Sequence, residues 1–344
     1  MAVTTPSLLV SAPPDRIGRG FAVGFLMLVG AAAGLSVYLP LSVAFGAVFL
    51  FAGPHNLLEF RYVLGRLPAR AGRLWSFFLW SGVGIVGLTL AYAVLPWVVT
   101  TMPRIGLQGY AVWSMALIWW VCGLIWQRSQ TNPRFDAGWV WAVACFLTAG
   151  VWLKPLALPL TAVYLHPLMA LWLLDREIAR SRPEWKRGYR VIALTVPLAI
   201  LLMWSQLREA PELPGADQIT IAFGPTVRAE TLTEHAGAWA LPGISPYFLV
   251  ATHTFLELVH YGIWVVLIPA IGLRSAPWDW NAIPAARRGP RWSRAIGALL
   301  LLSLLLVGVL WVCFGIDYES TRRIYFTIAM LHVLAEIPFL LRMV

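Results

Sequence analysis

Long apolar stretches separated by short polar segments run along the chain from about residue 21 onward. Ten of them come near the roughly 20 residues that a helix needs to cross the hydrocarbon core of a bilayer. They are 21–38, 41–62, 75–99, 107–126, 137–153, 156–174, 189–207, 246–272, 293–315 and 323–342. The fifth and sixth are the least secure, because only Lys154-Pro155 separates them and a re-entrant pair is the alternative. The pattern predicts an all-α polytopic membrane bundle that forms one transmembrane domain, residues 21–344.

The composition supports this class, since 59% of the 344 residues are hydrophobic and 12% are charged, against about 25% charged in soluble domains. With the N-terminus in the cytoplasm, twenty of the 26 Lys and Arg fall in inside segments and six in outside segments. This bias predicts that both termini are cytoplasmic. The net charge of +10 therefore indicates contact with membrane lipids and not with nucleic acid, and we expect a bacterial inner (cytoplasmic) membrane.

The segments outside the spans and the cysteines carry little chemistry. Residues 1–20 hold several Pro and Arg and no cleavable signal, so we expect a disordered cytoplasmic tail. The outside segment 208–245 is acidic and rich in Pro and Gly, with a hairpin expected over 218–223 and 226–231; it is either a packed external loop or a lid. Three isolated cysteines provide neither a disulfide framework nor a thiolate metal site.

The candidate chemistry is a His-x-x-x-Glu spacing that occurs three times, in His55/Glu59, His253/Glu257 and His332/Glu336. Each Glu in the predicted spans lies four residues after a His. This spacing places both groups on one helix face, where the carboxylate can bind a metal or hold the ring of a metal-binding His. Ionisable groups at membrane depth are costly and usually face a partner.

The topology brings these residues to similar depth, because the second, sixth, eighth and tenth spans all run from outside to inside and carry the five His of the membrane. At 1.5 Å per residue, most of the set lies within about two helical turns of one plane. Imidazoles with carboxylates suit iron, and less specifically copper, nickel or zinc. The predicted metal ligands are His55, His166, His260, His332, Glu257 and Glu336, with Glu59 and His253 as orienting or alternative ligands. His235, in the outer loop, is expected to be an ordinary surface residue.

Three pieces of the chain resemble the Brp/Blh family, multi-pass membrane enzymes that cleave β-carotene to retinal. Pro54-His55-Asn56-Leu57-Leu58-Glu59 is similar to that family's Pro-His-x-x-Leu-acid motif, and the segment His332–Glu336 is similar to its last helix. The pair His253 and His260 could match two His on a later helix. The resemblance implies non-haem iron at His55, His260 and His332, with His166 or His253 as a fourth ligand. In this chain the acid is Glu rather than Asp, the His pair is seven apart rather than four, and there are more spans.

Three functions follow from these observations. The first is a membrane-embedded iron oxygenase acting on an apolar polyprenoid or carotenoid-like substrate. The second is a non-catalytic membrane subunit that binds haem or chlorophyll through histidines in a larger complex. The third is a proton or metal-ion transporter. The sequence identifies neither the substrate nor the nuclearity of the metal site nor any protein partner.

Overall fold

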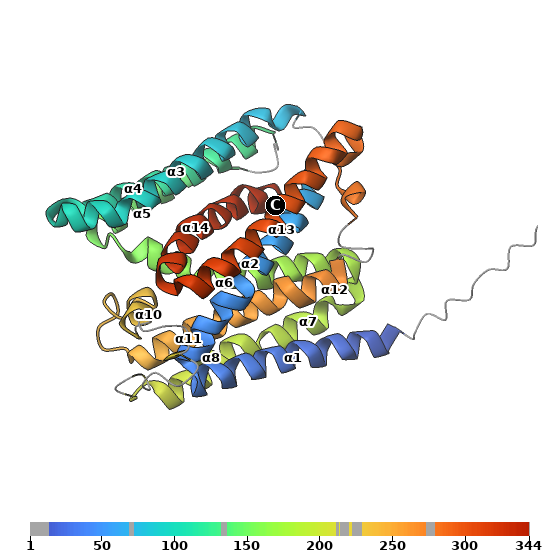
Figure 1. The fold of residues 1–344 in the computed structure, drawn as a ribbon. Coiled ribbons are helices and arrows are strands. Elements are labelled where there is room, and N and C mark those ends of the chain that lie inside the picture. Colours follow the sequence, from blue (N-terminus) through green and yellow to red (C-terminus); the bar gives the residue numbers. More distant parts are fainter. Residues whose placement is uncertain are drawn as a thin grey trace, which may run out of the picture.

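The computed structural model describes residues 14–68, 72–131, 136–210, 213, 220–221, 229–272 and 279–343. Over these ranges the regular secondary structure is helical, with no strand. Nine helical segments among them are long and apolar enough to cross a bilayer. The predicted all-α polytopic bundle is therefore confirmed (Figure 1).

The principal helices, in chain order, are α1 (Pro14–Tyr38), α2 (Pro40–Arg66), α3 (Trp75–Thr101), α4 (Pro103–Thr131), α5 (Val140–Leu153), α6 (Ala157–Ser181), α7 (Lys186–Ala193), α8 (Thr195–Leu207), α10 (Ala229–His235), α11 (Pro246–Gly262), α12 (Ile268–Gly272), α13 (Pro290–Ile316) and α14 (Tyr318–Met343). A π-helical segment, η3 (Ile263–Leu267), joins α11 to α12. Each of two spans consists of more than one helix: Pro183–Leu207 contains α7 and α8, and Pro246–Ile271 contains α11, η3 and part of α12.

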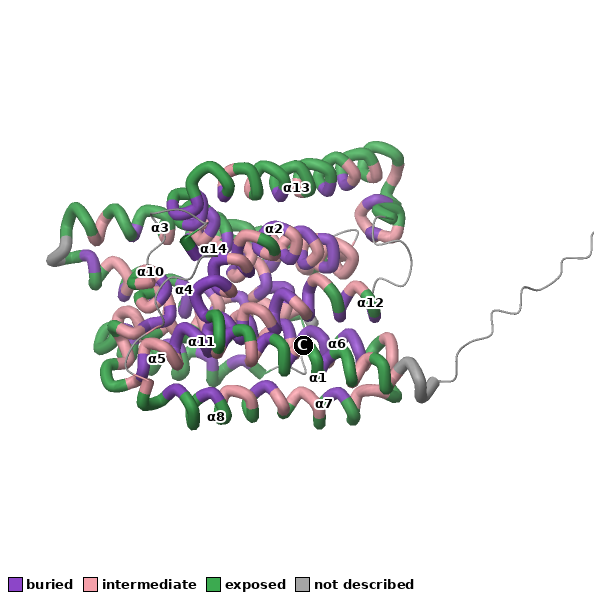
Figure 2. Tube along the Cα trace, turned by 60° about the horizontal axis from the view of Figure 1, so that its bottom comes forward, coloured by how far each residue is buried: buried purple, intermediate pink, exposed green. Residues whose placement is uncertain are grey.

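Two groups of helices flank the buried centre of the bundle. Helices α3, α4 and α5 pack together on one side of the molecule, and α1, α7 and α8 lie on the other side (Figure 1). Helices α2 and α11 lie between them and are the most buried spans, with 56% and 67% of their most apolar windows buried. Figure 2 shows this burial along α2 and α11 and the largely exposed surface of α13. The central position of α2 and α11 explains why their polar side chains have only protein neighbours.

Local sequence explains where these helices begin and how closely they pack. Pro40, Pro246 and Pro290 each stand at the start of a helix, where a missing N–H leaves no hydrogen bond unmade. The Ser245 hydroxyl accepts a hydrogen bond from the Phe248 N–H at 3.3 Å and caps α11. Gly53 lets α2 approach α13 so closely that a Cβ there would lie 2.9 Å from Cγ1 of Val307.

Two boundaries differ from those that the hydrophobic pattern predicts. Helix α1 begins at Pro14, so only residues 1–13 of the predicted tail lie outside the described residues. Helix α5 has 14 residues and is about 21 Å long, shorter than the roughly 30 Å hydrocarbon core. Helix α6 has 25 residues and full spanning length, and a turn over 154–156 connects it to α5.

The outer loop packs onto the bundle through α10. The hydroxyl of Tyr164 on α6 donates to the carbonyl of Ala236 at 2.8 Å, and Leu232 is buried. Residues 229–231 of the expected hairpin are helical, and 218–219 and 222–228 lie outside the described residues. Glu230 in the first turn of α10 favours a helix there, because a carboxylate stabilises a helix N-terminus.

Candidate metal centre

Four imidazole rings from four different helices meet in the middle of the bundle. We call His55, His166, His260 and His332 the central histidine cluster; they come from α2, α6, α11 and α14. Going round the cluster, the ring centroids of His55 and His260 are 5.3 Å apart, and those of His260 and His166 are 4.7 Å apart. The circuit closes with 4.9 Å from His166 to His332 and 5.5 Å from His332 to His55. The structure therefore gathers the four histidines that the sequence assigns to one site.

Hydrogen bonds fix the orientation of two of these rings. Nδ1 of His55 lies 2.9 Å from the carbonyl oxygen of Phe51, one helical turn earlier, and donates to it. Nδ1 of His166 lies 2.9 Å from Oε2 of Glu336 on α14. When Nδ1 carries the proton, the lone pair is on Nε2, which is the form of imidazole that binds a metal.

His260 lacks any such partner. Its side chain is 2% exposed, and among the described residues neither ring nitrogen makes a hydrogen bond of regular geometry, although the backbone carbonyl of Pro167 lies near the ring. A neutral imidazole has one N–H donor and one acceptor, and leaving a buried polar group unsatisfied costs about 1–3 kcal/mol. Something that accepts the lone pair of His260 would remove most of this cost.

Two buried carboxylates border the cluster. Glu336 is 3% exposed and Glu59 is 4% exposed, and the two carboxyl groups lie close enough to interact with each other. One ligand atom from each of His55, Glu59 and His332 lies within 4.8 Å of the other two. Glu59 is thus placed as a ligand candidate beside His55, while Glu336 orients His166.

The spacing of the nitrogens fits neighbouring ligands of one ion. Nε2 of His166 and Nε2 of His332 lie 3.1 Å apart. Two imidazole nitrogens that each bind a metal at about 2.1 Å are separated by roughly 3 Å when the angle between them is near 95°. The same distance also suits an N–H···N hydrogen bond, which would join the two rings without an ion. In this part of the bundle, the group whose ligand atoms all lie within 4.8 Å of one another consists of His55, Glu59 and His332, and His166 and His260 border it.

Glu257 lies elsewhere. It pairs with His253, whose Nδ1 is 3.6 Å from Oε2 of Glu257, and both lie next to His235 of α10. We call His235, His253 and Glu257 the outer cluster. The rings of His235 and His253 are 4.9 Å apart and nearly perpendicular. The structure therefore places His253 and Glu257, two residues of the predicted set, outside the central histidine cluster.

His235 is not the surface residue that its position in a polar loop predicts. Its ring lies 4.7 Å from that of Phe326 on α14, and the Arg322 guanidinium covers the same Phe326 ring at 4.8 Å. Burial, with His253 and Arg322 nearby, lowers the pKa of His235 well below its ordinary value. No periodic signal in the loop points to this residue. The nearby Arg322 cation disfavours a second cation here, so the outer cluster is a weaker metal candidate than the central one.

Aromatic residues enclose the central histidine cluster. Tyr261 lies against His55, with ring centroids 4.6 Å apart. One to two helical turns further toward the C-terminal ends of these helices, Trp264 and Phe339 pack against Tyr62, at 5.5 Å and 6.2 Å. All three are buried. This aromatic layer of Tyr62, Trp264 and Phe339 separates the cluster from the ends of α2, α6 and α14.

Comparison with protein-family models, with curated proteins and with solved structures finds no match for this chain. The class of protein therefore rests on the fold and on its side chains: a multi-pass membrane helix bundle with buried groups of His and Glu.

Proposed function

We propose that this protein is a membrane-embedded oxygenase that holds a non-haem iron in the central histidine cluster. The observation that carries the proposal is the buried His260 ring, which makes no hydrogen bond of regular geometry among the described residues and whose centroid lies 4.7–5.3 Å from those of two further imidazoles. Neutral imidazoles with carboxylates and no thiolate suit non-haem iron among the common metals. The three cysteines of the chain are free and lie on helices that supply none of the four histidines: Cys122 on α4, Cys145 on α5 and Cys313 on α13.

The residues of this chain have distinct roles in that site. His55, His166, His260 and His332 hold the metal, and Glu59 is the carboxylate placed to join them. Glu336 fixes the ring of His166, and the carbonyl of Phe51 fixes the ring of His55. The aromatic layer excludes water from one end of the site. A bound iron supplies the activation of O₂.

The substrate class follows from the surroundings. The cluster lies inside a bilayer-spanning bundle and has aromatic neighbours, so the substrate class that we propose is an apolar polyprenoid or carotenoid-like molecule that enters from the lipid. Cleavage of one C=C bond by O₂ places one oxygen atom on each carbon and yields two carbonyl products. This reaction needs no external reductant, and no soluble partner domain is needed to deliver electrons.

The two other functions receive less support. Imidazole rings packed 4.7–5.5 Å apart leave no plane between them for a haem or chlorophyll macrocycle. A transporter needs an open path on each side of the site in turn, and the aromatic layer closes one side among the described residues.

Metal analysis of the purified protein tests the proposal. Protein loaded anaerobically with Fe(II) should retain about one iron per chain, and incubation with β-carotene and O₂ should yield aldehyde products. The variant His332→Ala should lose the metal, whereas His253→Ala, in the outer cluster, should keep it. Less than about 0.2 transition metal per chain after loading would contradict the proposal, since a buried site that already brings His55, Glu59 and His332 together should retain the ion. A metal-loaded protein that contains zinc only would support the site and contradict the oxygenase.

A further inference from the structure

A pocket of about 210 Å³ lies where α2, α6 and α14 end, on the far side of the aromatic layer from the central histidine cluster. Its lining includes four arginines, Arg66, Arg176, Arg180 and Arg342, and a single carboxylate, Glu177. Four guanidinium groups and one carboxylate leave a formal excess of three positive charges. The positive-inside bias assigns this end of the bundle to the inner face of the membrane.

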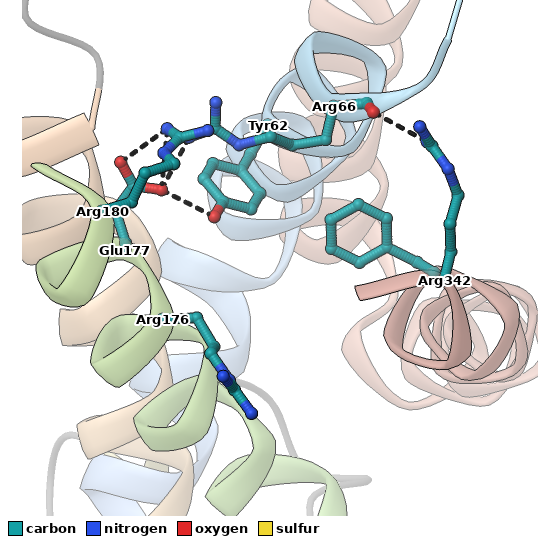
Figure 3. Close-up of a pocket in the computed structure, with 7 residues that line it drawn as sticks. Tyr62, Arg66, Arg176, Glu177, Arg180 and Arg342 are labelled. Carbon is teal, nitrogen blue, oxygen red and sulfur yellow. Dashed lines mark hydrogen bonds and ion pairs between the residues drawn. The ribbon is translucent and has the colours of Figure 1, made fainter. Parts of the chain in front are cut away.

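The internal pairing uses only part of that charge (Figure 3). Glu177 is 1% exposed and binds Arg66 at 2.6 Å and Arg180 at 2.9 Å, with the Tyr62 hydroxyl donating at 2.9 Å. The Ser181 hydroxyl also donates to Glu177, at 2.7 Å, so this carboxylate already has two cations and two hydroxyls. Its role is to hold Arg66 and Arg180 at the pocket.

The other two arginines have no carboxylate within ion-pair distance among the described residues. Arg342 donates to the backbone carbonyl of Arg66 at 2.8 Å, and Arg176 lies over the ring of Trp172 at 5.0 Å. Asp175 is next to Arg176 in sequence, but Arg190 binds both of its oxygens, at 2.8 and 3.0 Å. Arg342 caps the C-terminus of α2, which explains its position. Arg176 makes no such hydrogen bond to a helix end among the described residues.

We propose that this pocket binds the phosphate group of an anionic phospholipid from the inner leaflet. Guanidinium groups match phosphate oxygens with paired N–H donors, and basic pockets between spanning helices at this face bind lipid headgroups. Tyr62 and Phe339 give the pocket an apolar wall for the glycerol and upper chain of the lipid. The aromatic layer keeps the lipid chains away from the central histidine cluster, so this site is separate from the proposed oxygenase site.

Native mass spectrometry of the full chain, titrated with phosphatidylglycerol or phosphatidylcholine, tests this assignment. The wild type should bind phosphatidylglycerol selectively. The variant Arg176→Gln/Arg342→Gln should bind it about 30-fold more weakly, since each arginine near an anionic membrane surface contributes about a factor of five. The matched control Arg73→Gln/Arg187→Gln removes two exposed charges outside the pocket and should bind like the wild type.

Two further measurements make the result decisive. Arg176→Gln alone leaves the Arg342 hydrogen bond intact, so a selective loss of lipid binding by this variant, with unchanged thermal unfolding, supports the site. Equal phosphatidylglycerol binding by wild type and double variant would overturn it. Displacement of the lipid by an equal concentration of inorganic phosphate would overturn the lipid assignment in favour of free phosphate.

Discussion

The direction in which a helical side chain leans decides the position of two of the three glutamates in the His-x-x-x-Glu pairs. Side chains on a helix point back toward its N-terminus, so a Glu leans over the residue four positions before it. Glu257 accordingly lies against His253 and not against His260, which is three residues later. In the same way, Glu59 lies near His55. Glu336 is the exception, because its Oε2 lies 2.9 Å from Nδ1 of His166 on another helix. The His-x-x-x-Glu spacing therefore accounts for the positions of two of the three glutamates, and the Glu257-x-x-His260 spacing accounts for none.

Replacement of His260 tests whether this residue binds a metal or only makes contacts between helices. We expect His260→Leu to lose the metal, and we expect the metal-free variant to be as stable as metal-free wild type or more stable. The reason is that removing an unsatisfied buried imidazole relieves about 1–3 kcal/mol. Metal content and thermal unfolding of both proteins, with and without chelator, measure this.

The control for that experiment is His253→Leu. This variant should keep the metal and be less stable, because Glu257 loses its partner. Equal metal content in His260→Leu and wild type would contradict the assignment of His260 as a ligand.

The lowered pKa of His235 predicts that this residue contributes to the loss of folding stability at acid pH. Its folded-state pKa lies well below the value of about 6.5 that it has in an unfolded chain. As pH falls through about 6.5, protons bind the unfolded state first, so stability decreases, by roughly 1 kcal/mol for each pH unit below that value. His235→Gln should reduce the fall in melting temperature between about pH 7 and pH 5.5. An unchanged fall would contradict the burial of this ring against Phe326.

Each of the four helices that supply the central histidine cluster has a break in its regular hydrogen bonding close to the site. Pro54 precedes His55, Pro167 follows His166, and Pro338 lies two residues after Glu336. In α11 the π-helical segment Ile263–Leu267 begins three residues after His260. Proline and π-turns locally release backbone groups and are frequent at functional sites. The prolines are visible in the sequence, whereas the π-segment has no sequence signature.

Helix boundaries also explain why the site could be predicted in part. The tenth span begins at Tyr318, five residues before the predicted start, which moves His332 to about 21 Å from the start of its helix. His55 and His260 lie at about 22 and 21 Å from theirs, so three rings share one depth. Topology and periodicity were sufficient to predict this convergence. The outer cluster could not be predicted in this way. It depends on the packing of α10 and His235 onto α11, and no local sequence pattern encodes that contact.

The close approach of α2 and α13 gives a test at the scale of elements. Gly53→Leu should push the helices apart and destabilise the protein by about 1–3 kcal/mol, because even a Cβ at this position would lie 2.9 Å from Cγ1 and 3.3 Å from Cβ of Val307. It should also lower metal content, since His55 lies two residues away. Gly46→Leu, on the same helix with nothing within 4 Å of a Cβ, is the matched control. Similar melting temperatures for the two variants would contradict this packing.

Across the whole molecule, the shared direction of α2, α6, α11 and α14 requires that α5 cross the membrane although it has only 14 residues. In a chain whose three native cysteines are replaced by Ala, Lys154→Cys should react with an impermeant thiol reagent on intact cells. Gln130→Cys, in the last turn of α4 before the connection to α5, should react only after permeabilisation. Both positions are exposed. Labelling of both from one side would show that α5 turns back and that α6 runs in the opposite direction.

The origin of the four imidazoles on four separate helices has a consequence for biogenesis. Positions 55 and 332 are 277 residues apart, which is roughly 15–55 s of synthesis at about 5–20 residues per second. During that interval the N–H of His55 already has an acceptor within its own helix, the carbonyl of Phe51, so α2 can insert into the membrane before α14 is made. His260 has no such partner on its own helix, and its neighbours His55 and His166 lie on α2 and α6. Under the proposed function, metal loading follows the insertion of α14, because that helix supplies the last of the four imidazoles, His332.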